Sequence, residues 1–381
     1  MIKLLHLISG GDTGGAKTHL FSLMKGLQGH VDARIICFIR GSFYEDAKAL
    51  GIPIQVVEQK SRFDLGAMDG VVEDIKREGY DLVHCHGARA NFNALFIRNK
   101  IETPMLTTLH SDYRLDFKDS LAKNLIFTPL NGFALKRFNY YIAITQNFKD
   151  MMVERGFPKD QIFVGYNGLD FSREETYLSR EDFLARHQLE AYRDQVLVGM
   201  AARLDLVKDH RSLIEAISQV GDLLRGRVHF ILAGQGPERD YLNQRVQEED
   251  LSDVVSFIGQ IRDPFSLFNA VDLNLLTSKS ESFPYALLEG AKMKKPFISS
   301  DVGGIREMAG DSKGALFFPP GDSQALAQVL VKIQEDPQAL EAMGQRLYDH
   351  VKEHFSSEAM SATHEKIYGE ILKREGRSYE S

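Results

Sequence analysis

Glu281 and Glu289 stand eight residues apart in the segment ESFPYALLE, and this spacing limits what the two carboxylates can do. They are too far apart to share one proton, but they could hold two parts of one long ligand. Ser282 or Phe283 can cap a helix that has Pro284 at its first position. Because a helix amino terminus favours anions, the segment predicts a site for a ligand that carries phosphate. An exposed helix face is the alternative interpretation for either glutamate taken alone.

Two cations, Arg203 and Lys208, follow an apolar run in the segment MAARLDLVKDH. A guanidinium offers a fork of donors and an ammonium group a point charge, so two cations on one loop can converge on a diphosphate. A glycine turn with Gly234 and Gly236 follows the next apolar run, in AGQGPERDYL. Loop cations are usually solvated and a lone G-x-G is common, so neither pattern defines a site by itself.

The loop at residues 9–19 reads SGGDTGGAKTH, which is close to the G-x-x-x-x-G-K-T pattern of a P-loop. Ala16 occupies the position where a P-loop needs glycine, because a backbone N–H must curl around phosphate there. We therefore expect a turn at Gly14 and Gly15 that opens a helix at Lys17 and brings bare backbone close to a phosphate. A P-loop nucleotide-binding protein and a plain strand-to-helix turn stay open as the other interpretations.

Short apolar runs alternate with segments of helical spacing in both halves of the chain. In the N-terminal half the expected strands are KLLHLIS, ARIICFI, IPIQVVE, DLVHCHG, PMLTTLH, YYIAIT and IFVGYNG. In the C-terminal half they are QVLVGMAARL, VHFILAGQG, VVSFIGQ, DLNLLTS, KPFISSD and GALFFPPGD. Helical spacing marks THLFSLMKGL, DGVVEDIKREG and most of the tail from Asp322 to about Tyr379. Such alternation predicts the α/β class, with doubly wound, mostly parallel sheets that are buried on both faces.

The same pattern predicts two Rossmann-like domains, residues 1–170 and residues 195–360, joined by a polar linker at residues 171–194 that contains a helix. Ligands of such sheets bind beyond the carboxyl ends of the strands, which is where each of the motifs above falls. Two such sheets that faced each other would form one shared active-site cleft.

The motifs GGAKTH, TLH, YNGLD, ARLDLVKDH, AGQGP, SESFPYALLEGA and DVGGIRE occur in this order along the chain. With them, essentially the whole chain resembles the family 4 retaining glycosyltransferases, also called glycosyltransferase group 1. The resemblance implies the two-domain glycosyltransferase-B (GT-B) fold. It also implies that a final helix, at about residues 360–381, crosses back to the N-terminal domain. The Glu-x7-Glu segment and the Arg-x4-Lys loop are the most specific parts of the resemblance.

The resemblance also implies roles for individual residues. Catalysis would involve His110, facing the transferred sugar, together with Glu281, Arg203 and Lys208. The donor would be bound by Gly14, Gly15, Arg203, Lys208, Gly234, Glu281 and Glu289, with Phe283, Pro284 and Leu288 lining the pocket and Ile261 or Arg262 at the nucleobase. Within this set, Arg203 and Lys208 would clamp the diphosphate, and Glu289 would accept hydrogen bonds from the ribose. Outside the family, a lone histidine after a strand is more often a packed or capping residue.

The implied reaction is transfer of a hexose from a nucleotide diphosphate sugar to an acceptor hydroxyl, with retention of configuration. The expected donor is a UDP-sugar, and GDP-mannose is the alternative. The sequence contains no Asp-x-Asp, so we expect no catalytic divalent metal and no other cofactor. The alternatives are a GT-B-fold epimerase acting on UDP-N-acetylhexosamine, transfer to a soluble sugar, and a silent partner that binds sugar nucleotides without catalysis.

The acceptor is expected to bind the N-terminal domain through His86, Arg89, Asn91, Arg114 and Lys118. The stretch of residues 118–137 mixes basic and apolar side chains, which suits either a packed helix or loose contact with an anionic membrane surface. A lipid-linked glycan acceptor in cell-envelope polysaccharide or glycolipid synthesis fits this surface.

The composition is that of a globular protein, with 381 residues, of which 43% are hydrophobic and 26% charged. The formal net charge of -7 argues against nucleic-acid binding. Two cysteines, Cys37 and Cys85, provide no disulfide framework, and no run approaches the ~20 apolar residues of a membrane helix. We therefore expect a cytoplasmic enzyme, with at most peripheral contact at the inner face of a membrane.

Overall fold

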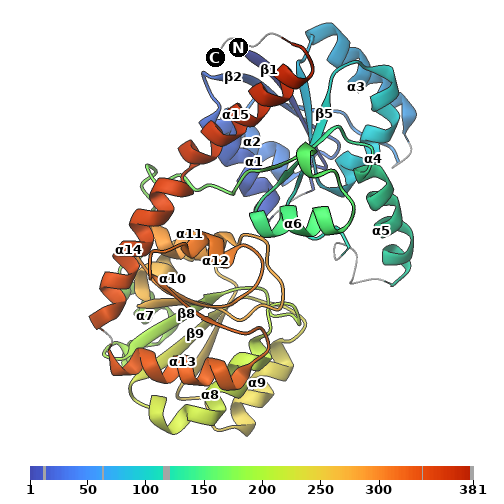
Figure 1. The fold of residues 1–381 in the computed structure, drawn as a ribbon. Helices are drawn as coiled ribbons and strands as arrows, with labels where there is room; N and C mark the ends of the chain where they lie inside the picture. Colours follow the sequence, from blue (N-terminus) through green and yellow to red (C-terminus); the bar gives the residue numbers. More distant parts are fainter. Residues whose placement is uncertain (12–13, 62–63, 115–120, 337, 378–381) are drawn as a thin grey trace. The chain divides into compact units, whose positions relative to one another are not determined.

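The computed structural model describes residues 1–11, 14–61, 64–114, 121–336 and 338–377 (Figure 1). They form two compact units, a first unit of Met1–Asp170 with Ser357–Ser381 and a second unit of Phe171–Ser356. Each unit is built on one parallel sheet covered by helices, so the predicted α/β class with two doubly wound sheets is confirmed.

Seven parallel strands form the sheet of the first unit, in the order β3-β2-β1-β4-β5-β6-β7. Their bounds are β1 (Ile2–Ile8), β2 (Val31–Cys37), β3 (Ile54–Val56), β4 (Leu82–His86), β5 (Met105–Leu109), β6 (Tyr140–Ala143) and β7 (Ile162–Val164). The central strands β4 and β5 are buried at every position, as continuous apolar runs between two helical layers require. Every strand predicted in the N-terminal half is present.

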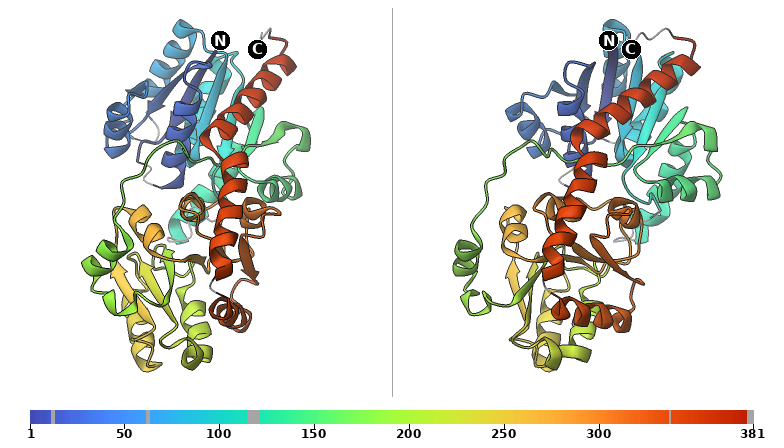
Figure 2. Two further views of the ribbon diagram at one scale, coloured as in Figure 1. Left: turned by 90° about the vertical axis from the view of Figure 1, so that its left-hand side faces the viewer. Right: turned by 60° about the vertical axis from the view of Figure 1, so that its left-hand side comes forward.

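The helices of the first unit come from both ends of the chain. They are α1 (Gly15–Gly26), α2 (Ser42–Ala49), α3 (Leu65–Glu78), α4 (Gly87–Ile97), α5 (Leu121–Leu135), α6 (Gln146–Glu154) and α15 (Ser357–Arg374). Ile367 and Ile371 of α15 share a buried apolar cluster with Leu20 and Leu23 of α1. Figures 1 and 2 show α15, in red, lying beside the blue elements with which the chain begins. The last helix is therefore part of the core of the first unit.

Six parallel strands form the sheet of the second unit, in the order β10-β9-β8-β11-β12-β13. Their bounds are β8 (Val196–Ala201), β9 (Val228–Ala233), β10 (Val255–Gly259), β11 (Leu273–Leu276), β12 (Phe297–Ser300) and β13 (Ala315–Phe318). The helices are α7 (Arg180–His187), α8 (His210–Leu224), α9 (Arg239–Glu248), α10 (Pro264–Ala270), α11 (Tyr285–Lys292), α12 (Ile305–Ala309), α13 (Ser323–Glu335) and α14 (Gln338–His354). All six strands predicted in the C-terminal half are present.

Residues 171–194, for which the sequence predicts a linker, belong to the second unit by their contacts. Within this segment, α7 buries Phe183 and Leu184 in one apolar cluster with Leu267 and Phe268 of α10. The composition of the segment is polar because only one narrow face of α7 is apolar.

The strand orders decide which loops meet. In the first unit β1 lies between β2 and β4, and β5 lies beside β4, so the loops after β1, β4 and β5 are neighbours. In the second unit β8 lies between β9 and β11, so the loops after these three strands are neighbours. Both groups of loops lie at the carboxyl edge of a parallel sheet, where such folds bind ligands.

Candidate active site

Lys208 and Glu281 come together at the carboxyl edge of the second sheet. Lys208 Nζ lies 2.5 Å from Glu281 Oε1, and Ser278 Oγ donates to the same oxygen at 2.6 Å. The Glu281 side chain is only 9% exposed and that of Lys208 26%, so the pair is largely shielded from water. The structure thus joins the loop after β8 to the loop after β11, two segments that the sequence separates by about seventy residues.

Arg203 is held differently, although it shares a loop with Lys208. Its Nε donates to Asp205 Oδ2 at 2.8 Å, while Asp205 Oδ1 accepts from the backbone N–H groups of Val207 and Lys208 at 3.0 Å each. Asp205 therefore fixes the shape of the loop. The Arg203 side chain is 64% exposed, so its guanidinium can reorient toward a ligand at little cost.

The position of Gly234 leaves no room for a side chain. Its φ is +152°, and a Cβ atom built on it would lie 1.9 Å from the carbonyl oxygen of Ala202. Gly236 is in the same situation, since its Cβ would lie 2.1 Å from Leu204 O. The two glycines let the loop after β9 press against the loop that carries Arg203, so they shape the site whether or not a donor touches Gly234.

The helix α11 starts later than the sequence predicts. The sequence predicts a cap at Ser282 or Phe283 and Pro284 as the first helical residue, but α11 begins at Tyr285 and Pro284 is its cap. The prediction was wrong because Pro284 has extended backbone angles, φ -72° and ψ 122°. In addition, the carbonyl of Ser282 accepts a hydrogen bond from Gly304 N at 2.8 Å, which holds it in the loop.

Phe283 and Leu288 have buried side chains. The Phe283 ring packs edge-to-face against Phe355, with 5.0 Å between the ring centroids. The Phe283 ring is thus engaged in packing, which leaves its backbone for the predicted contact with a donor. Ile261 is partly buried against the apolar cluster of α7 and α10, and Arg262 is exposed beside it.

Glu289 lies in the second turn of α11, in a site that disfavours its charge. Burial, and then repulsion from Glu175, raise the pKa of its carboxyl to about 7, and Lys292 offsets this only in part. The buried hydroxyl of Tyr285, on the same helix, has no hydrogen-bond partner among the described residues. This corner of the second unit therefore holds polar groups that its own residues leave partly unsatisfied, as a binding site for hydroxyl groups would.

Six histidines gather at the carboxyl edge of the first sheet. They are His6 on β1, His19 on α1, His84 and His86 on β4, His110 after β5, and His364 on α15. His110 is half-buried and the other five are fully buried. Burial lowers the pKa of each of them, to about 3 for His6 and His110 and to about 4 for His364, so all six are neutral at pH 7.

Hydrogen bonds connect three of these rings in a row. His6 Nδ1 lies 2.9 Å from His86 Nε2, and His86 Nδ1 lies 3.2 Å from His110 Nε2. His84 is separately bonded, through Nδ1 to the hydroxyl of Tyr368 and through Nε2 to that of Thr108. The sequence pointed only to His86 and His110, whereas His6, His19, His84 and His364 were missed. The H-C-H triplet was the available signal, because residues i and i+2 of a strand face the same side.

The loop after β1 opens a helix, as predicted, but at Gly15 rather than Lys17, with Gly14 as its cap. The helix starts early because the Gly14 carbonyl already accepts from the N–H groups of Lys17 and Thr18. The ammonium group of Lys17 forms an ion pair with Asp46 and is not directed at a P-loop phosphate.

The expected acceptor residues have different environments. Asn91 is buried and accepts from Thr107 Oγ1 at 2.7 Å, while Arg89 Nε donates to Gln59 at 3.1 Å. Arg114 is exposed, and Lys118 lies outside the described residues. His86 and Asn91 are buried and hydrogen-bonded to other residues of the first unit, so they stabilise the carboxyl edge of the first sheet.

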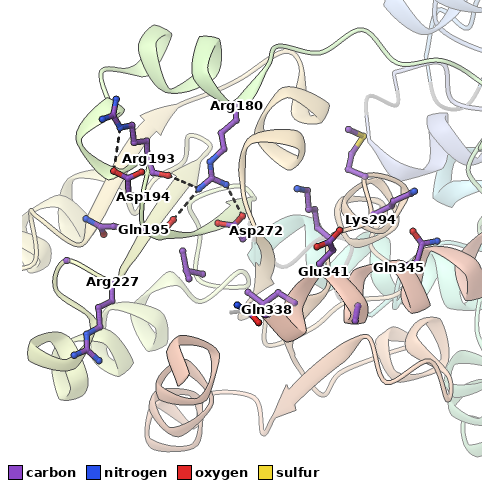
Figure 3. A pocket seen from close by; sticks show the side chains of 16 residues that line it. Arg180, Arg193, Asp194, Gln195, Arg227, Asp272, Lys294, Gln338, Glu341 and Gln345 are labelled. Atoms are coloured by element: carbon purple, nitrogen blue, oxygen red, sulfur yellow. Dashed lines mark hydrogen bonds and ion pairs between the residues drawn. The ribbon is translucent and has the colours of Figure 1, made fainter. Parts of the chain in front are cut away.

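A cavity of about 1180 Å³ lies at the opposite, amino-terminal end of the second sheet (Figure 3). Arg180, Arg193, Arg227, Lys294 and Lys295 are among its lining residues, and Asp272 and Glu341 contribute acidic groups. Arg180 donates to Asp272 at 2.8 Å and to the carbonyl groups of Ala270, Arg193 and Gln195. This guanidinium is thus already bonded to protein groups and ties α7 to the start of the strands.

Comparisons with known proteins identify the family of the chain. Residues 13–173 match the model for Glycosyltransferase Family 4, and residues 182–350 match the model for Glycosyl transferases group 1. The chain belongs to glycosyltransferase family 4. It is therefore a glycosyltransferase, and the P-loop protein and the epimerase are no longer supported as alternatives.

This glycosyltransferase has relatives with several substrates. It is 26% identical over 325 residues to the N-acetyl-alpha-D-glucosaminyl L-malate synthase of Bacillus anthracis, covering 83% of this chain and 82% of that protein. It is 22% identical over 329 residues to the O-antigen chain mannosyltransferase C of Escherichia coli, covering 84% of each chain. The family is thus shared, while the sugars and acceptors named for its members differ.

Solved structures show that the glycosyltransferase has the GT-B fold. Anabaena HepE in complex with UDP-glucose aligns with a TM-score of 0.78 and 25% identity, over 98% of this chain and all of that chain. A glycosyltransferase from Rickettsia africae aligns with a TM-score of 0.82 and 20% identity, over 98% and 99% of the two chains. Within the described residues, no helix is both long and apolar enough to cross a bilayer.

Proposed function

We propose that this glycosyltransferase transfers a hexose from a UDP-sugar to an acceptor hydroxyl, with retention of configuration, in the synthesis of a cell-envelope polysaccharide or glycolipid. The observation that carries the proposal is the contact between Lys208 and Glu281 at the carboxyl edge of the second sheet. A cation and a carboxylate held together in a shielded site offer a donor for phosphate and an acceptor for sugar hydroxyls.

The charge of the leaving group explains the cations. When the glycosidic bond of the donor breaks, the departing diphosphate gains negative charge. Lys208, a reoriented Arg203 and the amino terminus of α11 stabilise that charge more strongly in the transition state than in the bound donor. Each charge-assisted hydrogen bond contributes about 1.5–3 kcal/mol. No catalytic metal is invoked, because these groups supply the positive charge.

The two glutamates divide the rest of the donor. Glu281 accepts from hydroxyl groups of the transferred sugar, in exchange for its present bonds to Lys208 and Ser278. Glu289 accepts from the ribose, in a buried position where Lys292 balances its charge only in part. Uridine is proposed as the base because HepE binds UDP and UDP-glucose.

The acceptor side is proposed for the first unit. His110 is the half-buried member of the histidine cluster and is proposed to face the transferred sugar. The exposed Arg114 is proposed to offer a charge to the acceptor, whereas Gly14 and Gly15, at the start of α1, are proposed to offer bare backbone to the donor phosphate. The E. coli proteins named for O-antigen synthesis support a glycan acceptor.

A ligand panel tests the donor first. The thermal unfolding of the protein is followed with UDP, GDP, ADP and ATP, each with and without Mg²⁺. A nucleotide present at one hundred times its Kd should stabilise the fold by about 2.7 kcal/mol. Stabilisation by UDP in the absence of Mg²⁺ supports the proposal, whereas stabilisation only by GDP would replace the donor. Release of UDP from UDP-sugars in the presence of lipid-linked glycans then tests the transfer itself.

A further inference from the structure

The row His6–His86–His110 obeys a simple proton count. A neutral imidazole carries one hydrogen and one lone pair on its two nitrogens. His86 uses both nitrogens in the row, at 2.9 Å to His6 and 3.2 Å to His110, so it must donate to one neighbour and accept from the other. Burial lowers the pKa of all three rings, which keeps each of them in this one-hydrogen form at pH 7.

Only two arrangements satisfy this count. In the inward arrangement, His110 Nε2–H donates to His86, His86 Nε2–H donates to His6, and His6 keeps its hydrogen on Nε2. In the outward arrangement, His6 Nδ1–H donates to His86, His86 Nδ1–H donates to His110 Nε2, and His110 keeps its hydrogen on Nδ1. The two arrangements differ at the ends of the row, at His6 Nε2 and at His110 Nδ1.

The buried end of the row distinguishes between them. His6 is fully buried, and its Nε2 has no hydrogen-bond partner among the described residues. The inward arrangement would leave an N–H group there without an acceptor, and such buried N–H groups are rare in folded proteins. The outward arrangement leaves a bare nitrogen instead.

A neighbouring ring shows that the cluster accommodates a bare nitrogen. The Nδ1 of His364 lies 2.8 Å from the carbonyl oxygen of Met360, which can only accept, so His364 carries its hydrogen on Nδ1. Its Nε2 is then bare, and it is buried with no partner among the described residues. His19 repeats the pattern, with Nδ1 2.9 Å from Asn167 Oδ1 and an unpartnered, buried Nε2.

We infer that His6 and His86 hold His110 in the tautomer that carries its hydrogen on Nδ1, so that His110 offers a hydrogen-bond donor and no base to the sugar. His86 acts through His110 and is a positioning residue, as is His6. The chemical role of His110 rests on the function proposed above, but its tautomer depends only on the first unit. A neutral ring can donate a hydrogen bond to a sugar oxygen without adding a positive charge. The positive charge of the site then stays with the cations at the diphosphate.

The strand β4 provides a matched control. His84 and His86 are both buried, lie two residues apart on one strand and face the same side, but His84 bonds to Thr108 and Tyr368 and is not part of the row. His86→Phe cuts the row next to His110, whereas His84→Phe removes an equally buried imidazole and leaves the row intact. A general loss of packing would affect both variants, while loss of the tautomer would affect only the first.

The test is a tautomer measurement on the full-length protein labelled with ¹⁵N-histidine. Two-bond ¹H–¹⁵N correlation spectra distinguish an Nδ1–H ring from an Nε2–H ring, and His110→Gln assigns the signals of His110. We expect Nδ1–H for His110 in the wild type and in His84→Phe, and a shift toward the Nε2–H form in His86→Phe. We also expect kcat of His86→Phe to fall roughly 10–100-fold, as the loss of one hydrogen bond in the transition state would produce, with little change in KM for the donor.

An Nε2–H ring at His110 in the wild type would overturn the inference, and this result needs no variant of a fully buried residue. A stoichiometric transition metal in the purified protein would also overturn it, because ligand atoms of His19, His86 and His110 lie within 4.8 Å of one another and an ion there would replace the shared hydrogen. If the tautomer is as expected but His110→Gln transfers sugar normally, the inference stands and the proposed role of His110 fails.

Discussion

Both carboxyl edges of this glycosyltransferase place polar side chains at the end of a buried sheet, but the two edges stabilise these side chains differently. The edge of the second unit uses charges that neutralise one another, as in Lys208 and Glu281. The edge of the first unit uses neutral imidazoles, whose charged forms are suppressed by burial. A diphosphate needs permanent positive charge, whereas sugar hydroxyls need directed donors and acceptors. The difference therefore follows from the parts of the substrates that each edge is proposed to meet.

The largest expected difference between the edges is their response to acid. The histidines of the first edge have pKa values below the ordinary 6.5, so the unfolded chain binds more protons than the folded one below that pH. For His6, His110 and His364, stability is thus lost as the pH falls from 6.5 toward the folded pKa values of about 3 to 4, by up to about 1.4 kcal/mol per pH unit for each of the three. These three groups together cost several kcal/mol by pH 5. His19, His84 and His86, whose pKa values burial also lowers, add to the loss in the same direction.

Hydrogen exchange measured segment by segment at pH 7 and pH 5, corrected for the intrinsic rate, checks this prediction. The second unit contains two comparably buried histidines, His210 and His229, whose pKa values are lowered to about 4. We expect β1, β4 and β5 to lose protection before β8, β9 and β11. Earlier loss in the second unit would contradict the contrast.

The next effect concerns the charged edge. Lys208→Ala removes a cation from the proposed diphosphate site and leaves the shielded Glu281 without its partner. We expect kcat/KM to fall roughly 100- to 1000-fold, corresponding to about 3–4 kcal/mol of transition-state stabilisation. Steady-state kinetics with the UDP-sugar measure this. Lys100→Ala, which removes a surface ion pair with Asp69 in the first unit, is the control and should leave kcat/KM unchanged. A Lys208→Ala enzyme with near wild-type kcat/KM would show that the site lies elsewhere.

Glu289 differs from the other charged groups of the second edge because burial disfavours the charged form of its carboxyl. Its pKa is raised from an ordinary value near 4.5 to about 7, so the folded protein keeps this carboxyl protonated up to about pH 7 whereas the unfolded chain ionises it near pH 4.5. Its contribution to stability is therefore fully present below pH 4.5 and is lost as the pH rises through 7. Glu289→Gln cannot ionise. We expect this variant to be roughly 1–3 kcal/mol more stable than the wild type at pH 8 and equal to it at pH 4.5, while its KM for the donor rises. Thermal unfolding at the two pH values, with donor kinetics, decides; equal stability at pH 8 would mean that the carboxylate is not strained.

The smallest effect is expected at the start of α1. Gly14 has φ -110°, and a Cβ atom there would meet nothing within 4 Å, so Gly14→Ala should change the unfolding free energy by less than about 0.5 kcal/mol. Gly10 has φ +88° and its Cβ would lie 2.5 Å from Ile39 O, so Gly10→Ala should cost about 1–3 kcal/mol. Chemical denaturation compares the two. If Gly14→Ala also leaves donor binding intact, the first edge does not approach the phosphate at this glycine.

The strands could be predicted from the sequence, whereas the start of α11 and the packing of residues 171–194 could not. The thirteen strands were predictable because strands buried on both faces are short, continuous apolar runs. The predicted start of α11 was wrong because a proline is acceptable both as the cap and as the first helical residue, and the sequence does not show that Pro284 has an extended backbone. A helix within residues 171–194 was also predictable, but its packing against α10 depends on the single apolar face of α7, which a polar composition does not reveal.

The sequence by itself determined the alternation of strands and helices, the family, and the residue types that the reaction chemistry needs, because these depend on local pattern and order along the chain. Only the tertiary structure decided which of these residues meet. Parallel strands are joined by long crossovers, so His6, His86 and His110 become neighbours although up to about a hundred residues separate them in sequence. Lys208 meets Glu281 for the same reason, since β11 pairs directly with β8. Burial, which only the fold provides, then makes the first edge neutral while the second remains charged.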